Sequence, residues 1–184
     1  TAIDCTAEML AEAQANAGAL AAQITWKLMD AQKLEFADES FDLVLSRNLT
    51  WVLEEPETAY AEWYRVLRPK GIMLNFDANW YRYLYDEEAD RAATEANQVR
   101  DEYINTDIDA MEEIAKNVPL SSKLRPEWDR EVLQHIGESL DGGAGLAEVP
   151  HLLIHAQLDV GDIGGVQRLL QVGILHLLGV AELL

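Results

Sequence analysis

The chain has 184 residues, of which about half are apolar and a quarter charged, as in one ordinary globular domain. Its net charge of -19, from 14 basic and 33 acidic side chains, excludes the basic surface that nucleic-acid binding usually requires. One cysteine, no metal-like spacing of Cys and His and no membrane-length apolar run lead us to expect a cytoplasmic protein without disulfide, metal or membrane partner.

The first half of the chain alternates short apolar runs with helix-forming segments. A helix is predicted over 7–17, with Thr6 placed to cap it and Gly18 to stop it. A second helix is predicted over 56–67, and the Pro-Lys-Gly run at 69–71 is expected to end it. The predicted strands are residues 2–4, 24–30, 41–46 and 72–77.

This order of elements predicts an α/β fold with a mostly parallel sheet and helices on both faces. The apolar run 41–46 is expected to be a strand buried between two neighbours. Further helices are predicted over 86–117 and 125–137. The composition then changes, because the fourteen aromatic residues (5 Trp, 6 Tyr and 3 Phe) all lie at or before Trp128, so we expect a boundary near 137.

Three segments of the chain resemble the class I S-adenosylmethionine-dependent methyltransferases of the type 11 group. They are "AIDCTAEML" (2–10), "LMDAQKLEFADESFDLVLSRNLTWVL" (28–53) and "EWYRVLRPKGIMLNFDANWY" (62–81). The resemblance covers residues 1 to 85 and implies a Rossmann-like methyltransferase sheet. It also implies that a first strand and a glycine-rich loop of the form GxGxG should lie before Thr1, so 1–137 is expected to be a partial domain.

The resemblance implies S-adenosylmethionine as cofactor. The residues at the family's cofactor positions are Asp4, Cys5, Met9, Asp30, Ala31, Ser46 and Arg47. In the family the acid at the position of Asp4 accepts both ribose hydroxyls, and the acid at Asp30 receives the adenine amino group. A carboxylate suits a vicinal diol because its two oxygens accept two hydrogen bonds at once.

Each of these residues also has a purely structural interpretation. Asp4 would favour a helix N-terminus, and Asp30 would be a turn acid. Met9 would pack its helix on the sheet, and Arg47 would be a surface arginine. Cys5 is expected to be a small packed side chain rather than a nucleophile.

The resemblance also implies where the methyl acceptor binds. Candidate acceptor-binding residues are Asn48, Asn79 and Tyr81, which follow two strand ends; a loop packed under the helices of 86–117 is the alternative for 79–81. Trp51 is expected to pack the following helix. No histidine lies at a motif position, so the sequence names no catalytic base.

Residues 138–184 match no part of the family pattern. A frame shift after about Gly137 would explain this, and a second explanation is that Gly161, Gly164 and Gly165 stand in for the glycine-rich loop. The function expected from the resemblance is methyl transfer to a small-molecule acceptor. One alternative is a non-catalytic remnant, which we favour over activity for these 184 residues alone. The other is a nicotinamide-dependent oxidoreductase, whose fold also places an acid near the ribose. The sequence specifies neither the acceptor nor the oligomeric state.

Overall fold

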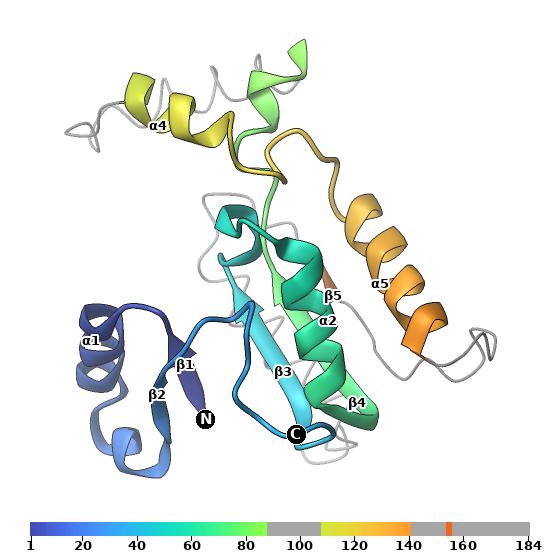
Figure 1. Ribbon diagram of the computed structural model, residues 1–184. Coiled ribbons are helices and arrows are strands. Elements are labelled where there is room, and N and C mark those ends of the chain that lie inside the picture. Colours follow the sequence, from blue (N-terminus) through green and yellow to red (C-terminus); the bar gives the residue numbers. More distant parts are fainter. Residues whose placement is uncertain (88–107, 141–153, 156–184) are drawn as a thin grey trace, which may run out of the picture.

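The strands form two small parallel sheets. The computed structural model describes residues 1–87, 108–140 and 154–155. The strands are β1 (Ala2–Asp4), β2 (Trp26–Leu28), β3 (Phe41–Arg47), β4 (Leu67–Phe76) and β5 (Ile154–His155). β1 pairs with β2, and β4 lies between β3 and β5, with every pair parallel. The strands β1 to β4 all run in the same direction, so their carboxyl ends lie at one edge (Figure 1).

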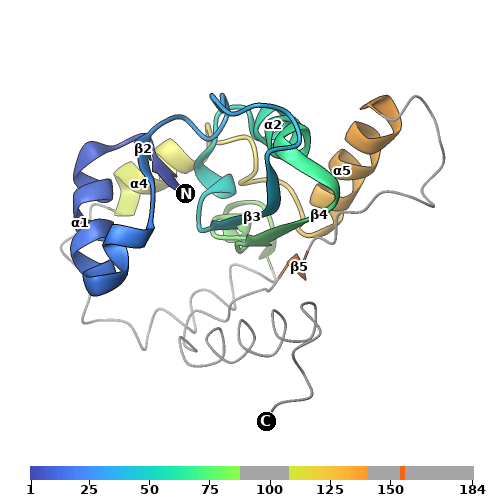
Figure 2. The ribbon, with the colours of Figure 1, turned by 90° about the horizontal axis from the view of Figure 1, so that it is seen from below.

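Helices connect these strands and cover them. The α-helices are α1 (Ala7–Ala17), α2 (Pro56–Val66), α4 (Ile108–Ala115) and α5 (Glu127–Leu140), and the 3-10 helices are η1 (Gly18–Gln23), η2 (Thr50–Val52) and η3 (Arg82–Leu84). α1 lies with β1 and β2 at one end of the molecule and α5 at the other, with α2, β3 and β4 between them (Figures 1 and 2). Parallel strands joined through helices make this a Rossmann-like α/β fold, present in part. No helix in the described ranges is both long and apolar enough to cross a bilayer.

The core lies between α2 and the strands. Tyr60, Trp63 and Val66 form one face of α2 at helical spacing, and all three are almost fully buried. Ile3 of β1 and Val44 of β3 pack against the same cluster. The two sheets therefore share one core although no backbone hydrogen bonds join β1 to β3.

The two predicted helices of the first half are confirmed. α1 has the predicted bounds, and Gly18 follows it with a φ of 53°, a left-handed conformation that glycine adopts at little cost. Thr6 occupies the N-cap position, but its side chain makes no capping hydrogen bond. Instead, Asp4 Oδ1 accepts the Thr6 backbone N–H at 2.8 Å.

The strand predicted over 72–77 starts earlier than expected. α2 ends at Val66, and β4 follows immediately. Contrary to the prediction, the Pro-Lys-Gly run therefore does not end the helix but forms an irregularity within the strand. Phe41 pairs with Leu67, whereas Leu43 pairs with Ile72, so β4 has extra residues between the two pairs.

Within this irregularity the left-handed residue is Lys70, with a φ of 68°, and not Gly71. Gly71 is needed for space instead. A Cβ atom there would lie 2.9 Å from both the Arg68 carbonyl oxygen and the Leu67 Cδ2 atom, and no real Cβ tolerates that approach.

The prediction that 41–46 is buried between two neighbours is wrong. β3 pairs only with β4 in the described part of the chain, and Leu43 and Leu45 are 43% and 51% exposed. Its unpaired edge is on the side of β1 (Figure 1). This exposure counts against the resemblance, which implied a strand covered on both sides.

The later elements differ from the predicted helices. Of the helix expected over 86–117, the structure shows α4, with turns at 116–117, and 88–107 lie outside the described residues. α5 replaces the helix expected over 125–137 and continues through Gly137 to Leu140, and the boundary near 137 stays a prediction.

The tail contributes one short strand to the described structure. β5 lies parallel to β4 at Leu74 and Asn75. The remaining residues beyond 140 lie outside the described part, so the frame shift expected after about Gly137 stays a prediction.

A charged cluster fastens the loop before β3 to α2. Arg65 donates to Glu62 at 2.7 and 2.8 Å, to Asp38 at 2.6 Å and to the carbonyls of Phe36 and Leu34 at 2.8 and 3.0 Å. Glu62 Oε2 also accepts the Leu34 N–H at 2.9 Å. The hydrogen bond from Arg65 lowers the pKa of Glu62 below its usual value.

This shift predicts part of the acid sensitivity of the fold. Because the pKa of Glu62 is lower in the folded chain than in the unfolded chain, its carboxylate stabilises the fold above the unfolded pKa, and this contribution is lost as the pH falls through the folded pKa. Glu62→Gln should therefore lower the free energy of unfolding at neutral pH and flatten its decline toward acidic pH. Urea unfolding at a series of pH values measures this. Glu57→Gln, an exposed acid on the same helix, is the control, and identical acid limbs in both variants would contradict the argument.

The space around Gly71 gives a second prediction. Gly71→Ala should destabilise the chain by about 1–3 kcal/mol, because the backbone near Arg68 must shift to admit the methyl group. Lys70→Gly should change the unfolding free energy by less than about 1 kcal/mol, since glycine accepts the left-handed conformation there. Thermal or urea unfolding distinguishes the two, and equal stability of both variants would show that β4 is not crowded at this point.

Candidate functional site

Two acidic residues lie at the carboxyl edge of the smaller sheet. In the parallel pair, Asp4 at the end of β1 stands opposite Leu28 at the end of β2, and Asp30 follows shortly after. Asp4 and Asp30 therefore lie at the same edge of this sheet, and that their carboxylates face one cleft stays a prediction. Ligands of open α/β sheets bind beyond such strand ends.

In each of the two carboxylates, one oxygen accepts hydrogen bonds from the loop that follows the acid. Asp4 Oδ1 accepts the Thr6 N–H at 2.8 Å, and Asp30 Oδ1 accepts the backbone N–H of Gln32 at 2.8 Å and its side-chain amide at 3.3 Å. No described residue donates a hydrogen bond to the second oxygen of either carboxylate. One oxygen of Asp4 thus behaves as expected of an acid at a helix N-terminus, and one oxygen of Asp30 as expected of an acid in a turn. The other oxygen of each carboxylate remains available to a ligand.

The other cofactor candidates of this edge are mostly exposed. Met9 on α1 is 58% exposed, so the interpretation that it packs the helix on the sheet is wrong. Cys5 is also exposed, contrary to the expected packed side chain. Ala31 is half-buried, and its carbonyl oxygen accepts the indole N–H of Trp63 at 2.9 Å, which fixes the loop after β2 to α2.

At the end of β3 the predicted residues divide into one buried and two exposed positions. Ser46 is 7% exposed, and its hydroxyl has no hydrogen-bond partner in the described structure. Arg47 and Asn48 are exposed, and Asn48 has a left-handed backbone with a φ of 52°. A buried hydroxyl without a partner costs free energy unless a water or a ligand satisfies it.

These groups fit the adenosine end of S-adenosylmethionine. Asp4 and Asp30 each keep an oxygen that can accept from hydroxyl or amino groups, and the thioether of Met9 is open to contact with a flat ring. The glycine-rich loop that the resemblance assigns to the methionine end is not among the residues of this chain. Within the described ranges no group of three His, Cys, Asp or Glu side chains is placed to hold a metal ion.

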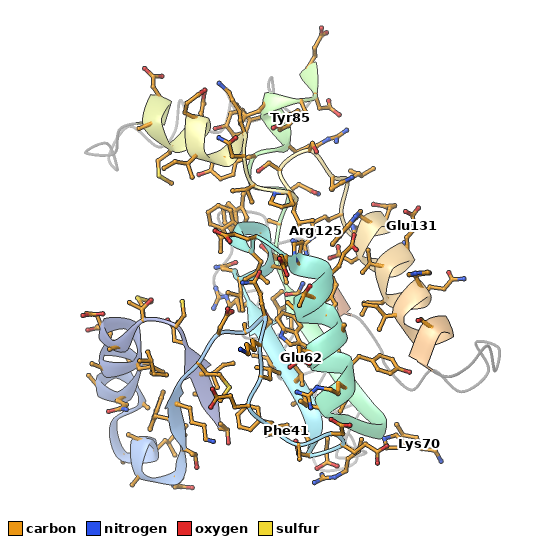
Figure 3. The ribbon with its side chains drawn as sticks, in the orientation of Figure 1. Phe41, Glu62, Lys70, Tyr85, Arg125 and Glu131 are labelled. Atoms are coloured by element: carbon orange, nitrogen blue, oxygen red, sulfur yellow. The ribbon has the colours of Figure 1, made fainter. Side chains whose placement is uncertain are left out.

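A buried polar network lies at the carboxyl end of β4, and the sequence did not predict it. Arg125, 2% exposed, binds Asp129 through Nε at 2.9 Å and Nη2 at 2.6 Å, and Asp77 through Nη1 at 2.9 Å. Its Nη2 also donates to Thr50 at 2.7 Å and to the Tyr60 hydroxyl at 3.2 Å. Figure 3 shows Arg125 between the first turns of α2 and α5.

The directions of these hydrogen bonds follow from the charges. Thr50 donates its hydroxyl proton to Asp77, and Tyr60 donates its proton to Asp129, because carboxylates only accept. Both hydroxyls then accept from the amide nitrogen of Asn75, at 3.1 and 3.0 Å. Burial raises the pKa of Tyr60 well above its ordinary value, so the phenol keeps the proton that it donates.

Asp77 connects this network to the loop after β4. Its carboxylate accepts the backbone N–H of Trp51 at 2.9 Å, that of Ala78 at 2.9 Å and the indole N–H of Trp80 at 3.0 Å. With Thr50 and Arg125 this makes five donors to one carboxylate of zero exposure. Asp77 therefore holds η2 and the loop after β4 in one arrangement.

The acceptor candidates of this loop have different surroundings. Asn79 donates to the Arg125 carbonyl and accepts the Arg125 N–H, both at 3.0 Å, so its amide is engaged by the main chain. Tyr81 is half-buried, with its ring centre 5.5 Å from that of Trp51. Trp51 was expected to pack the following helix, but it lies against the rings of Trp80 and Tyr81 instead.

The comparison with known proteins agrees with the motifs. Residues 1–75 match the family model described as a methyltransferase domain. An uncharacterized protein of Haemophilus influenzae is 40% identical over 79 residues, which are 41% of this chain and 32% of that protein. The ubiquinone/menaquinone biosynthesis C-methyltransferase UbiE of Roseobacter denitrificans is 40% identical over 80 residues, 40% of this chain and 30% of the relative.

A longer match is to phthiotriol/phenolphthiotriol dimycocerosates methyltransferase 1 of Mycobacterium ulcerans, 33% identical over 122 residues, which are 62% of this chain and 44% of the relative. The crystal structure of the cyclase SpnF superposes on 39% of this chain and 27% of its own, with 29% identity and a TM-score of 0.37. The chain spans about a third of the length of the first curated relatives it matches. Its first 75 residues resemble the type 11 group of class I S-adenosylmethionine-dependent methyltransferases.

The buried network predicts a large effect of removing Arg125. Arg125→Met should destabilise the chain by about 3–5 kcal/mol, because Asp77 and Asp129 would stay buried without their cation. Arg68→Met, which removes an arginine from an exposed ion pair with Asp42, is the matched control and should cost at most about 1 kcal/mol. Urea unfolding of both variants is the measurement. Equal losses would show that the Arg125 network contributes no more than a surface ion pair.

Proposed function

Because residues 1–75 match the methyltransferase domain family, we propose that this protein takes part in S-adenosylmethionine-dependent methyl transfer to a small-molecule acceptor. The observation that carries the proposal is the edge shared by β1 and β2. There Asp4 and Asp30 stand at neighbouring strand ends, each with one carboxylate oxygen that no described residue uses.

The residues of this edge would each bind a different part of the cofactor. Asp4 would accept hydrogen bonds from the ribose diol, and Asp30 would accept one from the adenine amino group. Met9 and the backbone at Ala31 would contact the adenine ring, and Cys5 would lie beside the ribose. S-adenosylmethionine supplies, when bound, a methyl group on a positively charged sulfur.

The end of β3 would complete the site on the acceptor side. Ser46 would gain a partner for its buried hydroxyl, and Arg47, exposed beside it, would pair with a carboxylate of the cofactor or of the substrate. The chain would contribute mainly positioning, which is what a displacement between two bound reactants requires. His135, the one histidine whose side chain is described, is exposed on α5, away from this edge, and we assign no base.

A small-molecule acceptor is supported by charge and by the relatives. The net charge of -19 opposes binding to nucleic acid. One relative is named for ubiquinone and menaquinone biosynthesis and another for phthiotriol dimycocerosates, which are small molecules rather than macromolecules.

One observation favours the alternative of a non-catalytic remnant for these 184 residues alone. Within the described residues β3 pairs only with β4, and its apolar Leu43 and Leu45 are exposed. We therefore propose that residues 1–184 supply the adenosine side of a site whose other side requires the glycine-rich loop.

This proposal predicts the effect of Asp4 on binding in a chain extended at its N-terminus by a strand and glycine-rich loop of the family. Asp4→Ala should weaken S-adenosylmethionine binding roughly ten- to a hundredfold, because the lost charge-assisted hydrogen bonds are worth about 1.5–3 kcal/mol. Asp4→Asn should cost less, since its amide oxygen still accepts one bond from the diol. Calorimetry measures both.

The control is Glu8→Ala, which removes an exposed acid from the first turn of α1 without touching the strand end. The 184-residue chain itself should bind more weakly than its extended form. Unchanged affinity in Asp4→Ala would remove Asp4 from the site. Tighter binding of a nicotinamide dinucleotide than of S-adenosylmethionine would replace the proposal by the oxidoreductase alternative.

A further inference from the structure

Aromatic side chains gather beyond the carboxyl ends of β3 and β4. The ring centre of Trp51, in η2, lies 6.2 Å from that of Trp80 and 5.5 Å from that of Tyr81. Tyr83, in η3, continues the group at 6.1 Å from Tyr81. All four are half-buried, and none belongs to the core cluster under α2.

These rings are held by a buried charge as well as by packing. Asp77 accepts both the backbone N–H of Trp51 and the indole N–H of Trp80, so the two indoles are fixed from one carboxylate. Arg125 fixes that carboxylate in turn, and it holds Asn79 through two main-chain hydrogen bonds. A rigid arrangement of this kind lowers the entropic cost of binding a ligand.

The rings are inclined to one another and only half-buried. The planes of Trp51 and Trp80 are inclined by 50° and those of Trp51 and Tyr81 by 40°, and each of the three side chains keeps part of its surface exposed. Aromatic rings pair favourably at centroid separations of this order, and a further flat ring can join them by edge or offset contact.

A polar group stands beside the rings. The Trp51 indole N–H donates to the Asn48 carbonyl at 3.2 Å, which ties the exposed residue after β3 to the aromatic group. No described residue hydrogen-bonds to the side-chain amide of Asn48. An amide both donates and accepts, and it therefore suits a hydroxyl group on a bound ring.

We propose that Trp51, Trp80 and Tyr81 form an aromatic wall that binds a hydroxylated planar aromatic acceptor, and that Asp77 and Arg125 are positioning residues for this wall. The role as methyl acceptor rests on the proposed function. It requires a ring bound beyond the carboxyl ends of β3 and β4, which run in the same direction as β1 and β2 (Figure 1). The binding of the ring itself requires only residues of this chain.

The first experiment uses the unaltered chain. Calorimetry compares a dihydroxynaphthalene with the decalindiol of the same skeleton, which keeps both hydroxyl groups but has no aromatic face. The aromatic diol should bind about tenfold more tightly, since each aromatic contact adds roughly a two- to tenfold gain beyond the area buried. Equal binding of the two diols, or binding of neither, would overturn the proposal without any variant having to fold.

The second experiment removes parts of the wall. Trp80→Leu should weaken binding of the aromatic diol roughly tenfold, whereas Trp80→Phe, which keeps a ring but loses the bond to Asp77, should weaken it less. Trp26→Leu, at the half-buried indole of β2, is the control and should bind as the unaltered chain does. Unchanged affinity in Trp80→Leu would overturn the assignment of the wall.

A matched pair of variants tests whether Asp77 positions the aromatic wall. Asp77→Asn and Asp129→Asn each remove one buried carboxylate from Arg125. Asp77 also accepts hydrogen bonds from Trp51 and Trp80 of the wall, whereas Asp129 accepts one from Tyr60 in the core. Asp77→Asn should weaken aromatic binding several-fold at temperatures where circular dichroism shows both variants folded, and Asp129→Asn should not. Equal losses of aromatic binding in the two variants would show that Asp77 supports the fold but does not position the wall.

The outcomes separate this inference from the proposed function. If the N-terminally extended chain fails to bind S-adenosylmethionine while the aromatic diol still binds through Trp80, the aromatic site stands and the methyl transfer does not. If the cofactor binds and the diol preference is absent, the acceptor belongs to another chemical class.

Discussion

The described structure depends on one buried cation. Arg125 lies far from Asp77 and Thr50 in sequence, by 48 and 75 residues, yet its guanidinium binds both in the interior. A fork of two hydrogen bonds to Asp129 fixes the guanidinium plane, which only arginine can do in this geometry. Because an unpaired charge is costly inside a protein, the groups that surround Arg125 have few other arrangements open to them.

The two sides of the proposed site are organised by different physical means. Parallel pairing of β1 with β2 brings Asp4 and Asp30 together, and each acid needs only its own turn to orient it. The proposed acceptor side depends instead on distant contacts, since Asp77, which accepts from Trp51 and Trp80, is itself bound by Arg125. The cofactor side is therefore local and open, whereas the acceptor side is a product of the buried network.

The two sheets share one core although β1 and β3 are not paired with each other. Ile3 and Val44 pack on the same cluster although their strands exchange no hydrogen bonds. Side-chain burial under α2 thus joins the two sheets where backbone pairing does not. Leu43 and Leu45 of β3 stay exposed, because no element in the described part of the chain covers them.

The sequence by itself determined the features that arise within a few residues. The bounds of α1, the glycine that ends it, the start of α2 at Pro56 and the end of β1 at Asp4 all follow from local conformational preference and periodicity, whereas β2 is shorter than the predicted strand 24–30 and ends at Leu28. Only the tertiary structure decided that β3 is an edge, that Gly71 is crowded and that Met9 and Cys5 are exposed. It alone revealed the Arg125 network, because a pattern of nearby residues carries no information about which distant charge will meet Asp77 when the chain folds.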